Sequence, residues 1–203
     1  SSLRLVFHGR ADHAGTTPMS DRRDAGMGAC AFALAARQTL LDHFPGCTMN
    51  IGSMQFAPGV FNIVPEKAIL SLEFRSILPE QKEQIESALL QQARLTAQQR
   101  LLEFEAEKLG SHAPQALHPQ AQRAIRAAAQ SLGLGCQDLA SGAAHDAQMM
   151  ASVCPAGMIF VPSVDGFSHS HREETAWEDC LRGAQTLLQA ALRMAWSRRP
   201  PSI

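Results

Sequence analysis

Segments with the two-residue periodicity of strands alternate with segments of helical periodicity over the first half of the chain. Strand patterns are found at residues 3–9, 48–56, 67–75 and 101–109. Helical patterns are found at residues 21–41 and in a segment that begins near Pro79. Apolar side chains at every second position line one face of a strand, so each strand is expected to be half buried. The order β-α-β-β-α-β predicts an α+β fold of ferredoxin-like type, in which two helices cover one face of a four-stranded antiparallel sheet.

The first helical segment gives an expectation about packing. Its apolar face is expected to lie on the sheet, and Ser20 or Asp21 is expected to cap its first turn. The residues assigned to that face are Met27, Cys30, Ala31 and Leu34.

The second half of the chain has a different pattern, which follows a boundary rich in breakers at residues 110–120. A short helix is expected at 120–132, and the apolar run 157–163 is typical of a strand buried on both faces of an α/β sheet. A long helix is expected behind the capping box Thr175-x-x-Glu178. A buried strand needs neighbours on both sides, and this half offers few. We therefore expect a discontinuous α/β domain whose other part is not in this chain.

Composition excludes several classes of partner. The formal net charge is −1 and no long basic run occurs, which argues against nucleic acid. No apolar stretch approaches the roughly 20 residues that span a bilayer, so no membrane partner is expected. The five cysteines are scattered, without a C-x-x-C pair, and are expected to be reduced thiols of a cytoplasmic protein.

Three polar clusters are candidates for chemistry, and each also has a structural interpretation. In the first, Asp12, His13, Thr16, Thr17 and Arg23 crowd a strand-to-helix turn, which is also how an ordinary polar turn looks.

The second cluster contains Asn62 and Arg75. An arginine on the exposed face of a sheet is either a solvated charge or a binding group, whose guanidinium donates two hydrogen bonds to a carboxylate. The third contains His145, His169 and His171, which are either loop histidines or metal ligands.

Taken in order, four segments resemble a known family. They are "GRADHAGTTPMSDRRDA", "FNIVPEKAILSLEFR", "SGAAHDAQMMA" and "MIFVPSVDGFSHSHREET". They are similar to the zinc-dependent N-carbamoyl-amino-acid amidohydrolases and allantoate amidohydrolases, within the aminoacylase and carboxypeptidase superfamily of metallohydrolases. The resemblance implies that residues 1–113 form a lid that also makes a homodimer. It implies that residues 114–203 are the C-terminal portion of the catalytic α/β domain, whose N-terminal part is absent.

The resemblance also implies residue roles. His13 would polarise the scissile carbonyl and stabilise the oxyanion, and in related dimers this histidine can reach the active site of the partner subunit. Asn62 and Arg75 would hold the carboxylate of the substrate, and His169 would be a metal ligand. A loop that contains Gly142, Ala143 and His145 would line the substrate pocket.

The implied chemistry is hydrolysis of a small ureido acid with two zinc ions per subunit, or another divalent ion such as manganese. The other metal ligands and the general base belong to an upstream segment of the family, so we expect this chain alone to be inactive. A hinge near residues 110–116 would close the lid and bring His13, Asn62 and Arg75 onto the substrate. The sequence departs from the family pattern at Ala144, where Gly is usual, and at His171, where Pro is usual.

Two rival interpretations remain open at this point. An aminoacylase or peptidase of the same superfamily would share the fold and the metals but cleave an acyl or peptide amide. A non-catalytic dimerisation module would use the same sheet without any chemistry.

Overall fold

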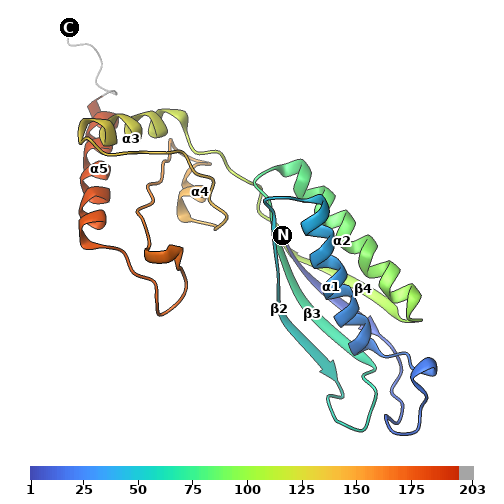
Figure 1. Cartoon of the computed structure of the whole chain (residues 1–203). Helices are drawn as coiled ribbons and strands as arrows, with labels where there is room; N and C mark the ends of the chain where they lie inside the picture. The colour runs from blue at the N-terminus through green and yellow to red at the C-terminus, as the bar shows by residue number, and fades with distance from the viewer. Residues whose placement is uncertain (197–203) are drawn as a thin grey trace. The chain divides into compact units, whose positions relative to one another are not determined.

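The computed structural model describes residues 1–196, which form two compact units. The first unit is Ser1–Pro114 and the second begins at Gln115 (Figure 1). The assignment of these units to a lid and to part of a catalytic domain stays a prediction.

The first unit has the predicted βαββαβ order. Its strands are β1 (Ser2–His8), β2 (Thr48–Ala57), β3 (Lys67–Arg75) and β4 (Glu103–Gly110). They form one sheet in the order β2-β3-β1-β4, and all three neighbouring pairs are antiparallel. The helices α1 (Ala25–His43) and α2 (Pro79–Gln99) cover one face of this sheet, as Figure 1 shows. The predicted fold class is confirmed.

The core of the first unit lies between the sheet and the two helices. The side chains that the alternation in β1 and β3 assigned to one face are buried: Leu3, Leu5, Phe7, Ala68, Leu70, Leu72 and Phe74. The ring of Phe7 lies 5.9 Å from that of Phe32 in α1 and 5.2 Å from that of Phe104 in β4. These ring contacts link β1 to α1 and to β4 within the core.

The predicted packing face of α1 is wrong. Met27 is 50% exposed, Leu34 is 74% exposed, and Cys30 is also exposed. The helix instead buries the opposite face, which consists mostly of small residues: Ala25, Gly28, Ala29, Phe32, Ala36 and Leu40. The expected cap is also wrong, because the side chain of Asp24 accepts the hydrogen bond from the Met27 N–H at 3.0 Å. Small side chains let the helix approach the sheet closely, and the larger apolar residues remain outside.

The second unit contains three α-helices in its described part. They are α3 (Pro119–Ser131), α4 (Asp146–Met150) and α5 (Trp177–Trp196). Residues 157–163, expected to form a buried strand, run through the unit without strand hydrogen bonding. A strand exists only when a neighbour accepts and donates its backbone hydrogen bonds, and the described part of this unit provides none.

The helix α5 forms as predicted, with the capping box misplaced by one residue. The Ala176 carbonyl accepts from Asp179 and Cys180, so Ala176 and not Thr175 precedes the first turn. The apolar face is not covered: Trp177 is 78% exposed, and only Thr186 and Ala190 are buried in this helix. Among the described residues, no helix combines the length and the apolar character needed to cross a membrane.

Candidate functional site

His13 lies in a tight turn within the connection between β1, which ends at His8, and α1. Its backbone carbonyl accepts hydrogen bonds from Thr16 at 3.2 Å and Thr17 at 3.0 Å. Its Nδ1 accepts a hydrogen bond from the Gly15 N–H at 3.1 Å. The side chain of His13 is exposed, and because Nδ1 is used within the turn, Nε2 is the ring nitrogen that could contact a ligand.

Asn62 lies beside His13, although 49 positions separate them in the sequence. The Asn62 carbonyl accepts from the Ala14 N–H at 2.9 Å, and the Asp12 carbonyl accepts from the Val64 N–H at 2.9 Å. These bonds join the His13 turn to the β2–β3 connection as a short antiparallel bridge. Two of the predicted site residues are therefore brought together.

Arg75 ends β3 and is exposed. Its Nε donates to Glu73 Oε1 at 3.1 Å, and its Nη2 donates to Glu73 Oε2 at 3.0 Å. A guanidinium that faces a carboxylate through two parallel hydrogen bonds is the geometry by which arginine recognises carboxylates. The side chain thus already holds the chemical group that the sequence predicted it to bind.

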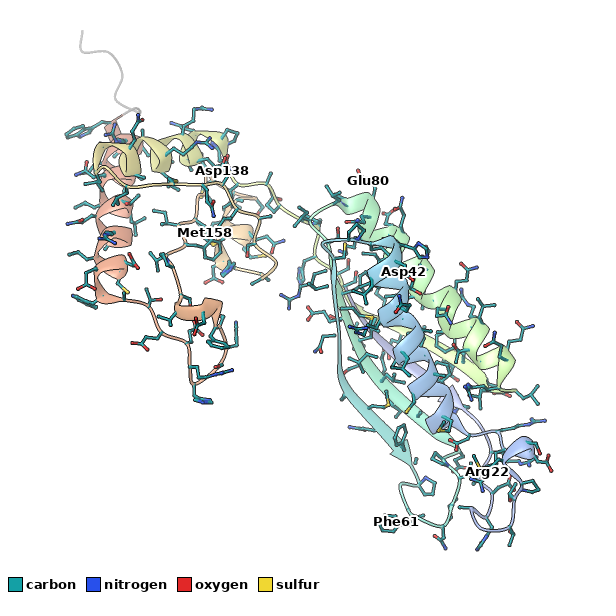
Figure 2. The ribbon with its side chains drawn as sticks, in the orientation of Figure 1. Arg22, Asp42, Phe61, Glu80, Asp138 and Met158 are labelled. Carbon is teal, nitrogen blue, oxygen red and sulfur yellow. The ribbon has the colours of Figure 1, made fainter. Side chains whose placement is uncertain are left out.

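The structure does not bring Arg75 to the other two residues. Asn62 precedes the first residue of β3, Lys67, and Arg75 is the last of its nine residues. Eight steps along a strand at about 3.3 Å each place the two ends of β3 roughly 26 Å apart. In Figure 2, Phe61 and Arg22 lie at one end of the first unit and Glu80 lies at the other. The expectation that one lid, by closing, brings His13, Asn62 and Arg75 onto one small substrate is therefore wrong for a single copy.

The loop that contains Gly142, Ala143 and His145 lies in the second unit, before α4. The Ser141 hydroxyl donates to the Ala143 carbonyl at 3.0 Å and accepts from the Ala143 N–H at 3.1 Å. The imidazole of His145 meets the ring of Phe160 edge-on at 5.6 Å. Gly142, Ala143 and His145 are all exposed, so the loop offers a surface rather than an enclosed pocket in this chain.

His169 lies in a turn that is closed by its own hydrogen bonds. Its N–H donates to Glu173 Oε2 at 2.7 Å, and the Glu173 N–H donates to the Ser170 carbonyl at 3.0 Å. The φ of His169 is +55°, a left-handed conformation that is uncommon for any residue with a Cβ. Such strain is concentrated at functional sites, where the surrounding structure compensates for it. The imidazole of His169 is exposed.

The described residues by themselves do not fit a metal ion. No group of three or more His, Cys, Asp or Glu side chains with metal-binding geometry occurs between residues 1 and 196. His169 is thus at most one ligand of such a site, and its predicted role stays a prediction.

A groove of about 860 Å³ lies elsewhere in the second unit, between α3 and α5. Its lining includes Ile125, Phe160, Val161 and Thr186, and none of the predicted site residues lines it. The groove therefore lies outside the predicted site.

Comparison with known proteins places the chain in a family. The model of peptidase family M20/M25/M40 matches residues 9–193. The chain belongs to this family. Amidohydrolases of the M20 family are in general metal-dependent.

Comparison with individual proteins shows which hydrolases the chain is similar to. An N-carbamoyl-L-amino acid amidohydrolase of Geobacillus stearothermophilus is 36% identical over 199 residues, which are 95% of this chain and 47% of that protein. A ureidoglycolate hydrolase of Arabidopsis thaliana is 31% identical over 189 residues, 92% of this chain and 40% of that protein. The crystal structure of an amidase of the hydantoinase/carbamoylase family from Burkholderia multivorans superposes with a TM-score of 0.86 at 35% identity, and covers 95% of this chain and 47% of that one. This M20 chain therefore spans about half the length of the relatives it matches.

The structure also adds residues that the sequence did not single out for function. Arg22, and not Arg23, is the arginine that folds back onto the His13 turn: its guanidinium donates to the carbonyls of Ala14 and Thr17. Adjacent arginines cannot be told apart by sequence pattern, because the backbone of the turn decides which one points inward. Gly15 is a second such residue, because its N–H donates to Nδ1 of His13.

Proposed function

We propose that the protein to which this chain belongs hydrolyses the C–N bond of N-carbamoyl or other ureido acids. The observation that supports this most directly is the 36% identity, over 95% of the chain, to an N-carbamoyl-L-amino acid amidohydrolase. The similarity to a ureidoglycolate hydrolase supports the same substrate class, since both names describe ureido acids. The chemistry of the site residues agrees with such a substrate, which carries a carboxylate at one end and a polar carbonyl at the other.

The carboxylate of the substrate would be bound by Arg75. The guanidinium already faces the Glu73 carboxylate through two hydrogen bonds, and a substrate carboxylate has the same shape and charge. Asn62 would supply a neutral amide donor beside His13. We therefore propose that Arg75 selects acids and that Asn62 orients them.

The carbonyl would be polarised by His13. With Nδ1 accepting from Gly15, the ring proton lies on Nε2, which can donate to an oxygen that gains negative charge in the transition state. Removing one donor of this kind typically costs about 100- to 1,000-fold in kcat. We assign to His13 this stabilisation of the oxygen by a hydrogen bond, and we assign it no role in proton transfer.

Metal chemistry would need residues beyond those described. One imidazole, that of His169, does not fix a divalent ion, because zinc sites use three or four protein ligands. We propose that the other ligands and the general base lie in the part of the relatives' length that this chain does not span. The chain alone is then expected to be inactive.

We further propose that two copies of the first unit form a homodimer through β2 and α1. Strand β2 is at one edge of the sheet, and α1 packs on the side of the sheet that contains β2 and β3. The exposed face of α1 carries Met27, Cys30, Leu34 and Leu41 along one stripe. A sheet edge and an apolar stripe on the same side of a unit are suited to a second copy related by a twofold axis.

Antiparallel pairing of two β2 strands would also bring Arg75 of one copy close to His13 and Asn62 of the other, although these residues are far apart within one copy. Thr48, at the start of β2, pairs with Arg75, whereas Ala57, at its end, pairs with Lys67 on the side of Asn62. In an antiparallel pair, the start of one β2 meets the end of the other. The His13 end of one copy would then lie beside the Arg75 end of its partner. Each active site would receive His13 and Asn62 from one copy and Arg75 from the other.

A substrate panel tests the proposed reaction. The intact protein, loaded with zinc or manganese, should release ammonia from N-carbamoyl amino acids or ureidoglycolate much faster than it cleaves N-acetyl amino acids or dipeptides. Activity on dipeptides alone would reject the ureido assignment in favour of a peptidase. No hydrolysis of any of these substrates by the metal-loaded protein would favour a non-catalytic module.

A further inference from the structure

The neutral form of His13 is restricted to one tautomer by its own turn. The Gly15 N–H points at Nδ1 at 3.1 Å, and a nitrogen that accepts a hydrogen bond carries no proton. A Cβ on Gly15 would lie 3.2 Å from Cε1 and 3.5 Å from Nδ1 of His13, so the ring packs directly on the glycine. The close approach and the hydrogen bond together fix both the orientation of the ring and the position of its proton.

This arrangement depends on the conformation of residues 13–17. The turn is exposed at His13, Gly15 and Thr16, and its internal backbone hydrogen bonds are the two from Thr16 and Thr17 to the His13 carbonyl. The bridge to Asn62 fixes the turn at Ala14, whereas its exposed far end, at Thr16 and Thr17, opens easily unless another group fixes it.

Arg22 is that group. It is half-buried, its Nε and Nη2 donate to the Thr17 carbonyl at 3.1 and 3.0 Å, and Nη2 also donates to the Ala14 carbonyl. The two carbonyls flank Gly15 on either side. A planar guanidinium that bridges both of them holds the glycine between them in place.

We propose that Arg22 is a positioning residue for His13: by bridging the Ala14 and Thr17 carbonyls, it keeps the Gly15 N–H on Nδ1 and so presents Nε2–H to the substrate. The consequence for catalysis rests on the proposed function, whereas the hydrogen bond and its dependence on Arg22 do not.

Nuclear magnetic resonance tests the structural step on this chain without any substrate. At about pH 8.5, where imidazoles are neutral, nitrogen spectra should show His13 with its proton on Nε2. A nitrogen–nitrogen coupling across the hydrogen bond should connect the Gly15 amide with Nδ1. In Arg22→Met the coupling should be lost, and in Arg22→Lys it should be weakened, because one ammonium does not reproduce the planar fork that bridges both carbonyls.

The chain supplies two matched controls. Arg23→Met removes the same charge at the neighbouring exposed position and should leave the coupling intact. His118 accepts from the Gln120 N–H through Nδ1 at 3.2 Å, the same local geometry in the second unit, and should be unaffected by every Arg22 variant. Should Arg22→Met fail to fold, Arg22→Lys carries the test. No coupling in the unmodified chain, or a coupling that survives in the variant, overturns the proposal.

A kinetic cycle tests the functional step in the intact protein. Arg22→Met should lower kcat about 100-fold, as expected for a group displaced by an ångström. In a His13→Ala background the same substitution should change kcat less than about two-fold, because Arg22 acts through His13. A full additional loss would show that Arg22 acts otherwise and would overturn the proposal. If the protein hydrolyses no ureido acid, the proposed function fails while the spectroscopic result still decides the role of Arg22.

Discussion

Gly9 is the position at which the turn that carries His13 is most sensitive to a single methyl group. A Cβ added there would lie 1.9 Å from the carbonyl oxygen and 2.9 Å from the carbonyl carbon of Arg23. Backbone atoms cannot yield as the end of a flexible side chain can, so the two segments must separate in Gly9→Ala. The separation disrupts the hydrogen bonds from Gly9 to Glu66 at 2.7 Å and from Arg10 to Arg23 at 2.9 Å.

The expected loss follows from these contacts. Each hydrogen bond contributes about 1 kcal/mol, and displacement of the adjoining buried residue Ala25 adds about 1 kcal/mol more, so the free energy of unfolding should fall by about 2–4 kcal/mol. Urea unfolding followed by circular dichroism measures this as a lower midpoint. Gly110→Ala is the matched control, because a Cβ there has open space, and it should change stability by less than about 0.5 kcal/mol. If Gly9→Ala is as stable as the control, the close approach at Arg23 does not exist in solution.

Three further outcomes are expected. Phe7→Ala removes the buried ring that contacts Phe32 and should lower the free energy of unfolding by about 3–5 kcal/mol in the same urea experiment. A decrease below about 1 kcal/mol would contradict the packing of Phe7 in the core. Leu34→Asp places a charge on the exposed stripe of α1 and should convert dimer to monomer in sedimentation while leaving the circular dichroism spectrum of the folded chain unchanged, and a persistent dimer would reject that interface. Arg75→Lys keeps the charge but loses the fork, so KM for ureido acids should rise about ten-fold with kcat nearly unchanged, and an unchanged KM would remove Arg75 from the carboxylate site.

The sheet of the first unit could be read from the sequence because its periodicity is unambiguous. In β3 every second residue from Ala68 to Phe74 is apolar, and these residues are the buried ones. The packing face of α1 could not be read in the same way. Ala, Gly and larger apolar residues occur all around this helix, so hydrophobicity alone does not choose a face, and the close approach of helix and sheet chose the small residues.

The second unit shows a different limit of sequence analysis. The run 157–163 has the composition of a buried strand, but a strand is defined by its neighbours, and the described residues supply none. The same shortage leaves Trp177 and Leu187 of α5 exposed. The composition of residues 157–163 predicted a strand, and the absence of pairing partners among the described residues explains why no strand forms there.

The sequence names candidate residues for the site, which stay a prediction, but it does not give their arrangement. The motifs predicted His13, Asn62 and Arg75, whereas the bridge between His13 and Ile63 places Asn62 beside His13, and the length of β3 places Arg75 at the far end of that strand. The role of Arg22 needed the backbone of the turn, since sequence alone does not say which of two adjacent arginines folds inward.

The assembly of each active site from two copies is tested most directly by mixing two inactive variants of the intact protein. His13→Ala and Arg75→Ala homodimers should each be nearly inactive. In a mixed dimer, one site receives the intact His13 of one copy and the intact Arg75 of the other. Half of the dimers in an equal mixture are mixed, so about a quarter of the unmodified activity should return. If activity does not return although mass spectrometry shows mixed dimers, both residues act within one copy, and the proposed arrangement is wrong.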